Sequence, residues 1–179
     1  VVLSAVVVTL ILAVLLVWHS AQFYPFISDD ALISLRYARR LLDGQGLTWT
    51  PGAPVEGYSN LLWILLLAGA GALGADLIDA ARVLGTAALS LIPLFVLLSG
   101  ERRDLLPLAS SVLLLVFLPL DVTAATWAIG GLEMPLFALL LSGAALLLRR
   151  AYDRGFQTTW DVVPPALLLG LAAVTRPDG

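Results

Sequence analysis

The sequence predicts an all-α fold: a polytopic bundle of transmembrane helices, with an amphipathic juxtamembrane helix in its first outer loop. Composition is the first reason, because 60% of the 179 residues are hydrophobic, 13% are charged and the mean hydropathy is +0.96. A soluble domain carries about 25% charged residues. The second reason is that the apolar residues form long runs. A chain of this length cannot bury so much apolar surface in one core, so we expect the bilayer to be its solvent.

The charged and reactive residues exclude several classes of protein. The net charge is −3 and every basic residue except the one histidine is arginine, so there is no basic surface for a nucleic acid. The absence of cysteine excludes a disulfide framework, a cysteine-ligated zinc and a thiol nucleophile. A soluble enzyme and a disordered tail are excluded by the apolar composition.

The apolar runs are the predicted membrane segments. Val1–Trp18 is long enough to cross the hydrocarbon core, and it lacks the basic start and the small-residue cleavage site of a signal peptide. The later runs are Leu61–Ala75, Val83–Ser99, Leu105–Leu120, Pro135–Leu148 and Val162–Val174. Several of them need their weakly polar flanks to reach across a bilayer.

Arginine placement predicts the orientation of these segments. Glu101–Asp104 and Arg149–Arg154 are short and arginine-bearing, which is typical of cytoplasmic loops. If both loops are cytoplasmic, Val83–Ser99 crosses the membrane toward the cytoplasm. His19–Asn60 then lies on the outer side only if Leu61–Ala75 does not cross the membrane. Leu61–Ala75 is then interfacial or re-entrant. The alternative makes it a full span and places the arginine loops outside.

On the preferred topology, most of the acidic residues share the outer face. They are Asp29, Asp30, Asp43, Glu56, Asp76, Asp79, Asp121, Glu133 and Asp178. The long polar segment 19–60 belongs to the same face, and a loop of that length is usually functional. We therefore expect a functional site there.

Asp29–Asp43 is the predicted amphipathic helix of the outer loop. Apolar residues recur at helical spacing, namely Leu32, Leu35, Ala38 and Leu42. This face is suited to lie on the bilayer surface. Ser28 is a good N-cap and Gly44 a natural stop, so taken alone the segment is an ordinary amphipathic helix.

The charged residues of this helix suggest chemistry as well. Asp29 and Asp30 are adjacent carboxylates at the membrane edge, where one could act as a general base or both could hold a divalent cation. Arg36, Arg39 and Arg40 could bind a phosphate. For Arg39 and Arg40 we favour contact with lipid head groups or pairing with Asp43.

Two further charged residues belong to the outer face. Glu133 is either a simple helix-start acid, with Pro135 following, or a second carboxylate facing the same cavity as Asp29. Arg176 either extends to the interface or binds an anion. The tryptophans are expected in the interfacial belts, and His19 is expected to be interfacial too. The tryptophans are Trp18, Trp49, Trp63, Trp127 and Trp160.

Several segments together resemble one family. They are Asp29–Arg39, Gly44–Leu47, Pro51-Gly52, Val55–Trp63, Gly131–Phe137 and Thr175–Gly179. In order and spacing they resemble the GT-C glycosyltransferases, which are multi-spanning enzymes that use polyprenyl-phosphate sugars. The nearest likeness is to bacterial relatives of the arabinofuranosyltransferases and of the protein mannosyl- and aminoarabinose transferases. Family members are longer, so the resemblance implies that residues 1–179 are a single membrane domain from the N-terminal part of such an enzyme.

The resemblance implies roles for the acidic residues. Asp29 is the catalytic base and Asp30 lies beside it. Glu133 supports the base, or joins Asp29 and Asp30 in holding a divalent cation such as Mg or Mn.

The resemblance also implies where the substrates bind. The aminoarabinose branch has a lysine near the position of residues 56–60 that contacts the donor phosphate. This sequence has no lysine, so Arg36 or Arg176 would take that role. The loop residues Glu56, Tyr58 and Asn60 would then contact donor or acceptor.

The expected function is transfer of a sugar from a polyprenyl phosphate to an acceptor hydroxyl, with inversion, at the periplasmic side of a bacterial inner membrane. The expected partners are membrane lipids, the lipid-linked donor and a glycan, lipid or protein acceptor, with no nucleic acid. One alternative is a transporter or lipid flippase, which would carry ionisable residues near the middle of its spans. Another is a structural membrane subunit without catalysis.

Overall fold

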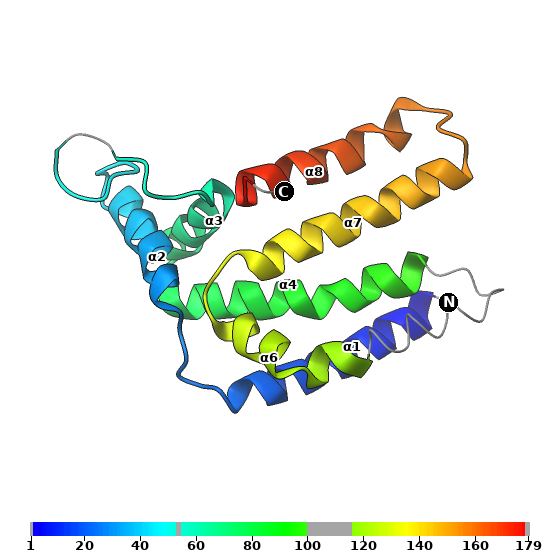
Figure 1. Ribbon diagram of the computed structural model, residues 1–179, viewed down its shortest axis with the longest axis horizontal. Helices are drawn as coiled ribbons and strands as arrows, with labels where there is room; N and C mark the ends of the chain where they lie inside the picture. Colours follow the sequence, from blue (N-terminus) through cyan, green and yellow to red (C-terminus); the bar gives the residue numbers. More distant parts are fainter. Residues whose placement is uncertain (1, 53–54, 100–115, 178–179) are drawn as a thin grey trace.

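The computed structural model describes residues 2–52, 55–99 and 116–177, and within these ranges the chain is helical with no strand (Figure 1). The predicted all-α fold is therefore confirmed for the described residues. The helices are α1 (Val2–Ala21), α2 (Asp29–Leu42), α3 (Leu61–Ala72), α4 (Leu77–Ser99), α6 (Val122–Ile129), α7 (Met134–Asp153), the short 3₁₀ helix η1 (Thr159–Asp161) and α8 (Val163–Thr175).

Three of the described helices are long and apolar enough to cross a membrane. These segments are Leu3–Ala21, Leu77–Leu98 and Met134–Asp153. They are compatible with a membrane protein, as composition predicts. The predicted run Val162–Val174 lies in α8, which at 13 residues is shorter than a full span. Most of the run Leu105–Leu120 lies outside the described residues.

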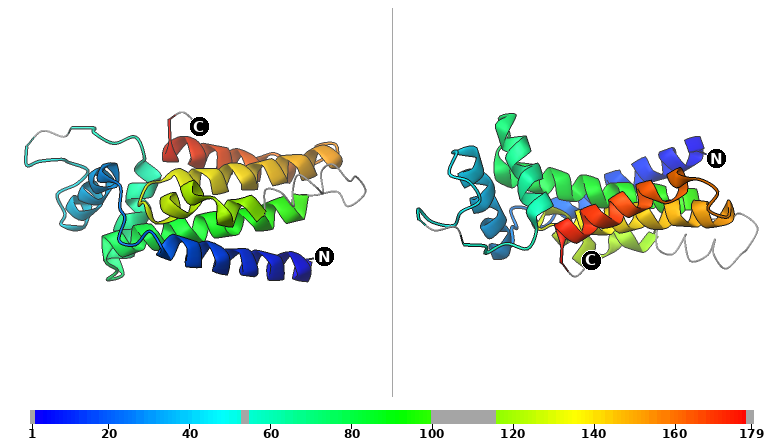
Figure 2. Two further views of the ribbon diagram at one scale, coloured as in Figure 1. Left: turned by 60° about the horizontal axis from the view of Figure 1, so that its bottom comes forward. Right: turned by 90° about the horizontal axis from the view of Figure 1, so that it is seen from above.

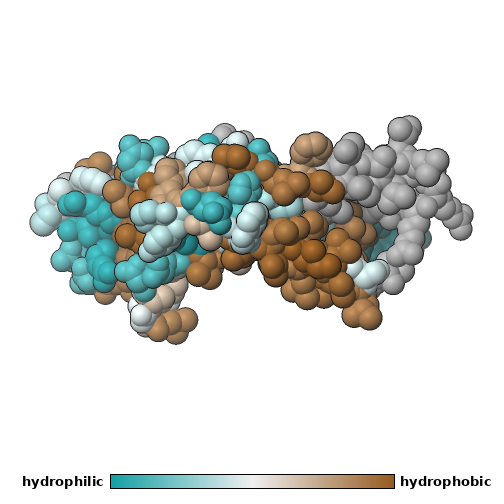
Figure 3. Space-filling view, turned by 90° about the horizontal axis from the view of Figure 1, so that it is seen from below, coloured by the Kyte–Doolittle hydropathy of each residue, from teal (hydrophilic) through white to brown (hydrophobic). Residues whose placement is uncertain are grey.

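The long helices lie side by side, and α2 and α3 cover one end of them (Figures 1 and 2). Helices α1 and α8 run toward that end, whereas α4 and α7 run away from it. We call this end, with residues 22–52, 55–76, 130–133 and 176, the loop end. The connection between α7 and α8, residues 154–162, lies at the opposite end. Hydrophilic surface gathers at the loop end and hydrophobic surface covers the helices (Figure 3).

This arrangement bears on the two topologies left open by the sequence. Helix α3 has 12 residues and lies at the loop end beside α2, so it is too short to cross a bilayer. The segment Arg149–Arg154 lies at the opposite end, in agreement with the preferred arrangement. Glu101–Asp104 is outside the described residues. Which end faces the cytoplasm stays a prediction.

Helix α2 begins at the predicted Asp29 and ends at Leu42, one residue before the predicted Asp43, but its apolar face does not lie free for the bilayer. Leu35 and Ala38 are buried, and Leu42 packs so closely on α3 that a Cβ at Gly71 would come within 2.5 Å of it. The physical reason is that α3 is apolar on every side and supplies a protein surface for α2. Gly44 ends the helix with a φ of +71°, as predicted.

The expectation of an interfacial belt is wrong for Trp63, whose side chain is completely buried in the core formed by α2, α3 and α4. The other four tryptophans are exposed in part or largely. His19 contacts the protein, because its Nδ1 lies 2.9 Å from the carbonyl oxygen of Pro119.

Candidate functional site

Glu133 is the central residue of the loop end. It immediately precedes α7, and its side chain is only 8% exposed. One carboxylate oxygen, Oε2, accepts a hydrogen bond of 2.8 Å from Nδ2 of Asn60. The other, Oε1, lies 3.2 Å from Nη1 of Arg176 in a charge-assisted contact. Both oxygens are thus held by protein groups.

Asn60 extends this arrangement to α2. It is buried just before α3, and its Nδ2 also donates to Oγ of Ser34 over 2.8 Å. The amide nitrogen carries two hydrogens, so it can satisfy both acceptors. We call Ser34, Asn60, Glu133 and Arg176 the buried network. It links side chains from four parts of the chain that are distant in sequence.

The loop before Glu133 is fixed by backbone contacts. Nε1 of Trp63 donates to the carbonyl oxygen of Gly131 over 3.0 Å. The backbone N–H of Ser28 donates to the carbonyl oxygen of Gly130 over 2.9 Å. Gly131 has a φ of +86°, and a Cβ there would lie 2.5 Å from Cδ1 of Ile27. The turn therefore requires glycine, both for its conformation and for close packing.

Asp29 and Asp30 lie in the first turn of α2, and both are exposed. Oδ1 of Asp29 accepts the backbone N–H of Asp30 over 3.0 Å. Because Ser28 is bonded to Gly130, α2 begins directly beside the loop that leads to Glu133. The start of α2 thus places two exposed carboxylates, Asp29 and Asp30, beside the loop that leads to the enclosed carboxylate of Glu133.

The expected three-carboxylate cation site is not assembled. Within the part of the chain that the structure describes, no three histidine, cysteine, aspartate or glutamate side chains are grouped so that they could hold a metal ion. The two oxygens of Glu133 face Asn60 and Arg176, and neither faces Asp29 or Asp30. The physical reason is that burial of Glu133 requires donors, and an amide and a guanidinium supply them.

The two arginines predicted to bind phosphate lie in different surroundings. Arg36 donates from Nε to the carbonyl oxygen of Trp49 over 2.8 Å, and its guanidinium lies 4.4 Å from the centre of that indole ring. It lines a hollow of about 400 Å³ together with Arg39. Arg40 donates from Nε to Oγ1 of Thr48 over 2.8 Å, and its expected contact with lipid head groups stays a prediction. Arg176, and not Arg36, is joined to Glu133.

The loop residues predicted to contact substrates lie in three kinds of environment. Glu56 is exposed, Tyr58 packs edge-on against Tyr37 with 4.8 Å between ring centres, and Asn60 belongs to the buried network. Sequence reasoning missed Tyr37, whose hydroxyl donates to the carbonyl oxygen of Val55 and accepts from the backbone N–H of Gly57. A tyrosine on the apolar side of an amphipathic helix is the signal, because a buried hydroxyl needs such partners.

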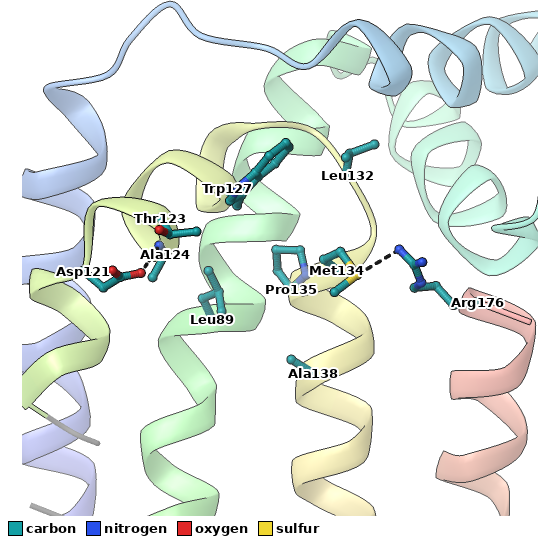
Figure 4. Close-up of a pocket in the computed structure, with 10 residues that line it drawn as sticks. All are labelled: Leu89, Asp121, Thr123, Ala124, Trp127, Leu132, Met134, Pro135, Ala138 and Arg176. Atoms are coloured by element: carbon teal, nitrogen blue, oxygen red, sulfur yellow. Dashed lines mark hydrogen bonds between the residues drawn. The ribbon is translucent and has the colours of Figure 1, made fainter. Parts of the chain in front are cut away.

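A cavity of about 590 Å³ adjoins the buried network, between α4, α6, α7 and the end of α8 (Figure 4). Most of its walls are apolar, among them Leu89, Trp127 and Ala138. Arg176 borders it on one side and Asp121 on the other (Figure 4). Nη1 of Arg176 also lies 3.0 Å from Sδ of Met134. A cavity of this size accommodates a small-molecule ligand or part of a lipid.

Comparison with known protein families, with curated proteins and with solved structures finds no match to this chain. A function for the loop end therefore has to be argued from its own residues. Three features of the loop end bear on its function: the buried network, the exposed acids beside it and the apolar cavity bordered by Arg176.

Proposed function

We propose that the chain is the membrane-embedded part of a GT-C-type glycosyltransferase, which transfers a sugar from a polyprenyl phosphate to an acceptor hydroxyl at the loop end. One observation carries the proposal. The segments that resemble this family are far apart in the sequence, yet their polar residues meet in the buried network. The enclosed carboxylate of Glu133 therefore joins residues from the segments on which the resemblance depends.

In this proposal Asp29 is the general base. It is exposed and begins α2 beside the loop of Glu133, so it can meet an acceptor hydroxyl. Asp29 takes the proton of that hydroxyl while the oxygen attacks the anomeric carbon. The bond from this carbon to the phosphate oxygen breaks, and polyprenyl phosphate leaves from the opposite face. The configuration at the anomeric carbon is therefore inverted.

Glu133 and Arg176 serve the leaving group. Glu133 is enclosed and bonded at both oxygens, so it is suited to orient Arg176 and poorly suited to exchange protons with a substrate. The guanidinium of Arg176 borders the cavity and supplies positive charge for the departing phosphate. A divalent cation such as Mg or Mn, held by the substrate and an outer acid, would add to this charge.

The cavity supports a lipid-linked donor. A polyprenyl phosphate has a long apolar chain directly joined to an anionic head group. Leu89, Trp127 and Ala138 present an apolar surface within the same cavity that Arg176 borders. Asp121 borders the opposite side of the cavity, so the anionic head group would lie on the side of Arg176 and the apolar chain along the apolar walls.

The distribution of ionisable residues favours this proposal over a transporter or flippase. Those of α4 are Asp79 and Arg82, near its start, and those of α7 are Arg149, Arg150 and Asp153, in its last turns. In α1 the histidine lies in the last turn. Within the described spans, ionisable groups are thus absent from the middle, where a transport pathway would use them.

The test is a transfer assay on membranes that contain the protein, with labelled polyprenyl-phosphate sugars as donors. We expect Asp29→Asn to lower transfer by at least about 100-fold, because general-base catalysis contributes that much. The matched control is Asp43→Asn, which removes an exposed carboxylate at the other end of α2 and should stay within about 2-fold of wild type. Transfer by Asp29→Asn at the wild-type rate would overturn the assignment of the base. Movement of the lipid across the bilayer, with no transfer of sugar by the wild type, would favour the flippase.

A further inference from the structure

The segment between α1 and α2 leads directly to Asp29, and one arginine of α4 holds it. We call residues 22–28 the α1–α2 linker. Nη2 of Arg82 lies 2.7 Å from the carbonyl oxygen of Pro25 and 3.3 Å from that of Phe26, and donates to both. Its guanidinium carbon also lies 4.8 Å from the centre of the Tyr24 ring. Three successive residues of the linker therefore contact one side chain.

The contacts of Arg82 differ in how much water reaches them. Its side chain is 14% exposed, whereas Asp79, 3.6 Å away across an ion pair, is 72% exposed. An ion pair with so exposed a partner contributes little. The carbonyl groups of Pro25 and Phe26 lie outside any helix, and a guanidinium gives them the donors that such groups need. The linker contacts are therefore the ones that matter for Arg82.

The linker is also held from the side of the buried network. The ring of Phe26 meets Trp127 edge-on, with 6.0 Å between ring centres, and Ser28 is bonded to Gly130. The linker thus lies between α4 on one side and the α6–α7 connection on the other. Together these contacts set where α2 begins relative to Glu133.

We propose that Arg82 is a positioning residue for Asp29, acting through the linker carbonyls. This inference rests on the proposed function, in which Asp29 is the base. Arg82 itself contacts neither substrate nor Asp29. It determines where the first turn of α2 lies, and therefore how the Asp29 carboxylate meets the acceptor hydroxyl. A lysine in its place would bring one compact charge that could donate to the carbonyl groups, but it would lack the planar guanidinium that lies over the Tyr24 ring.

The test compares Arg82→Gln, Arg82→Lys and Asp79→Asn in the transfer assay. We expect Arg82→Gln to lower kcat by at least about 10-fold with little change in the KM for donor, because a small misplacement of a catalytic group is costly. Arg82→Lys should recover part of the loss. The matched control Asp79→Asn removes only the exposed ion pair, so its kcat should stay within about 2-fold of wild type.

A combined variant separates positioning from a general structural role. When Asp29→Asn is already present, Arg82→Gln should cause no further loss, because the group that it positions is gone. A full additional loss in that background would overturn the inference, as would a wild-type kcat in Arg82→Gln. Thermal unfolding and size-exclusion chromatography show whether Arg82→Gln folds. If it does not, Arg82→Lys takes its place, and it should likewise cause no further loss of transfer in the Asp29→Asn background. Wild-type transfer by Asp29→Asn alone would instead overturn the proposed base.

Discussion

The two ends of the bundle are held together by contacts of different kinds. At the loop end, Asn60 bonds to Glu133 across 73 positions of sequence, and Arg176 bonds to Glu133 across 43. At the opposite end, the ion pair of Arg149 and Asp153 spans 4 positions, and that of Arg154 and Asp161 spans 7. Ion pairs between residues close in sequence stabilise the ends of single helices, whereas contacts between distant residues determine how separate segments pack together. Among the described residues, this difference separates the loop end, where distant segments meet, from the opposite end, where the ion pairs are local.

Each end contains a buried acid, so the two ends can be compared through these residues. Glu133 has a side chain that is 8% exposed and that of Asp161 is 3% exposed. The partners of Asp161 are Thr158 and Arg154, its neighbours in the chain. The partners of Glu133 come from α8 and from the residue before α3. Burial alone therefore does not indicate a functional acid, and the origin of its partners is more informative.

The largest effect on stability is expected at Glu133. Glu133→Ala removes the buried carboxylate that Asn60 and Arg176 share, and should lower the free energy of unfolding by about 3 kcal/mol. Asp153→Ala, at the opposite end, removes an exposed pair and should cost about 0.5 kcal/mol. Unfolding in detergent, followed by circular dichroism, measures both. Equal losses in the two variants would show that the two ends do not differ as described.

A smaller effect is expected from two glycines with similar backbone conformations. Gly131 has a φ of +86° and no room for a Cβ, whereas Gly155 has a φ of +74° with no atom within 4 Å of such a Cβ. Gly131→Ala should therefore cost about 2 to 3 kcal/mol, from strain and from the clash with Ile27. Gly155→Ala should cost only the backbone strain, about 1 kcal/mol. The same unfolding measurement tests this, and a greater loss at Gly155 would contradict it.

The smallest effect is expected at Asp161 and depends on pH. The backbone N–H of Thr158 lowers the pKa of this carboxyl below its ordinary value of 3.8, and hydrogen bonding to Arg154 adds to that against the opposing effect of burial. Because the pKa is lower in the folded state, its stabilisation is present above pH 3.8 and is lost as pH falls through the lowered value. Asp161→Asn should remove this part of the acid dependence without changing sugar transfer. Identical acid unfolding profiles of the variant and the wild type would contradict the predicted contribution of Asp161 to stability.

The helices could be predicted because their causes are local. The apolar spacing from Asp29 to Leu42, the glycine that ends α2 and the apolar run of α3 all act within a few residues of one another. The shortness of α3 likewise follows from the polar residues and glycines that border it. The choice of a membrane-compatible fold follows from composition.

The site could be predicted only in part. The acidic outer face and the list of candidate residues came from sequence patterns and from a resemblance. Sequence patterns did not predict the enclosure of Glu133, the burial of Trp63, the packing of α3 over α2 or the contact of Arg82 with the linker. Each of these contacts depends on which distant segment supplies a hydrogen-bond donor or an apolar surface. The spacing of residues within one segment does not predict which distant segment will pack against it.

The sequence by itself determined the helices, the apolar surface and the scarcity of charge, since backbone hydrogen bonding and hydropathy depend on neighbouring residues. Only the tertiary structure decided which charges meet. A buried carboxylate is stable where donors reach it, and for Glu133 those donors arrive from segments 73 and 43 positions away.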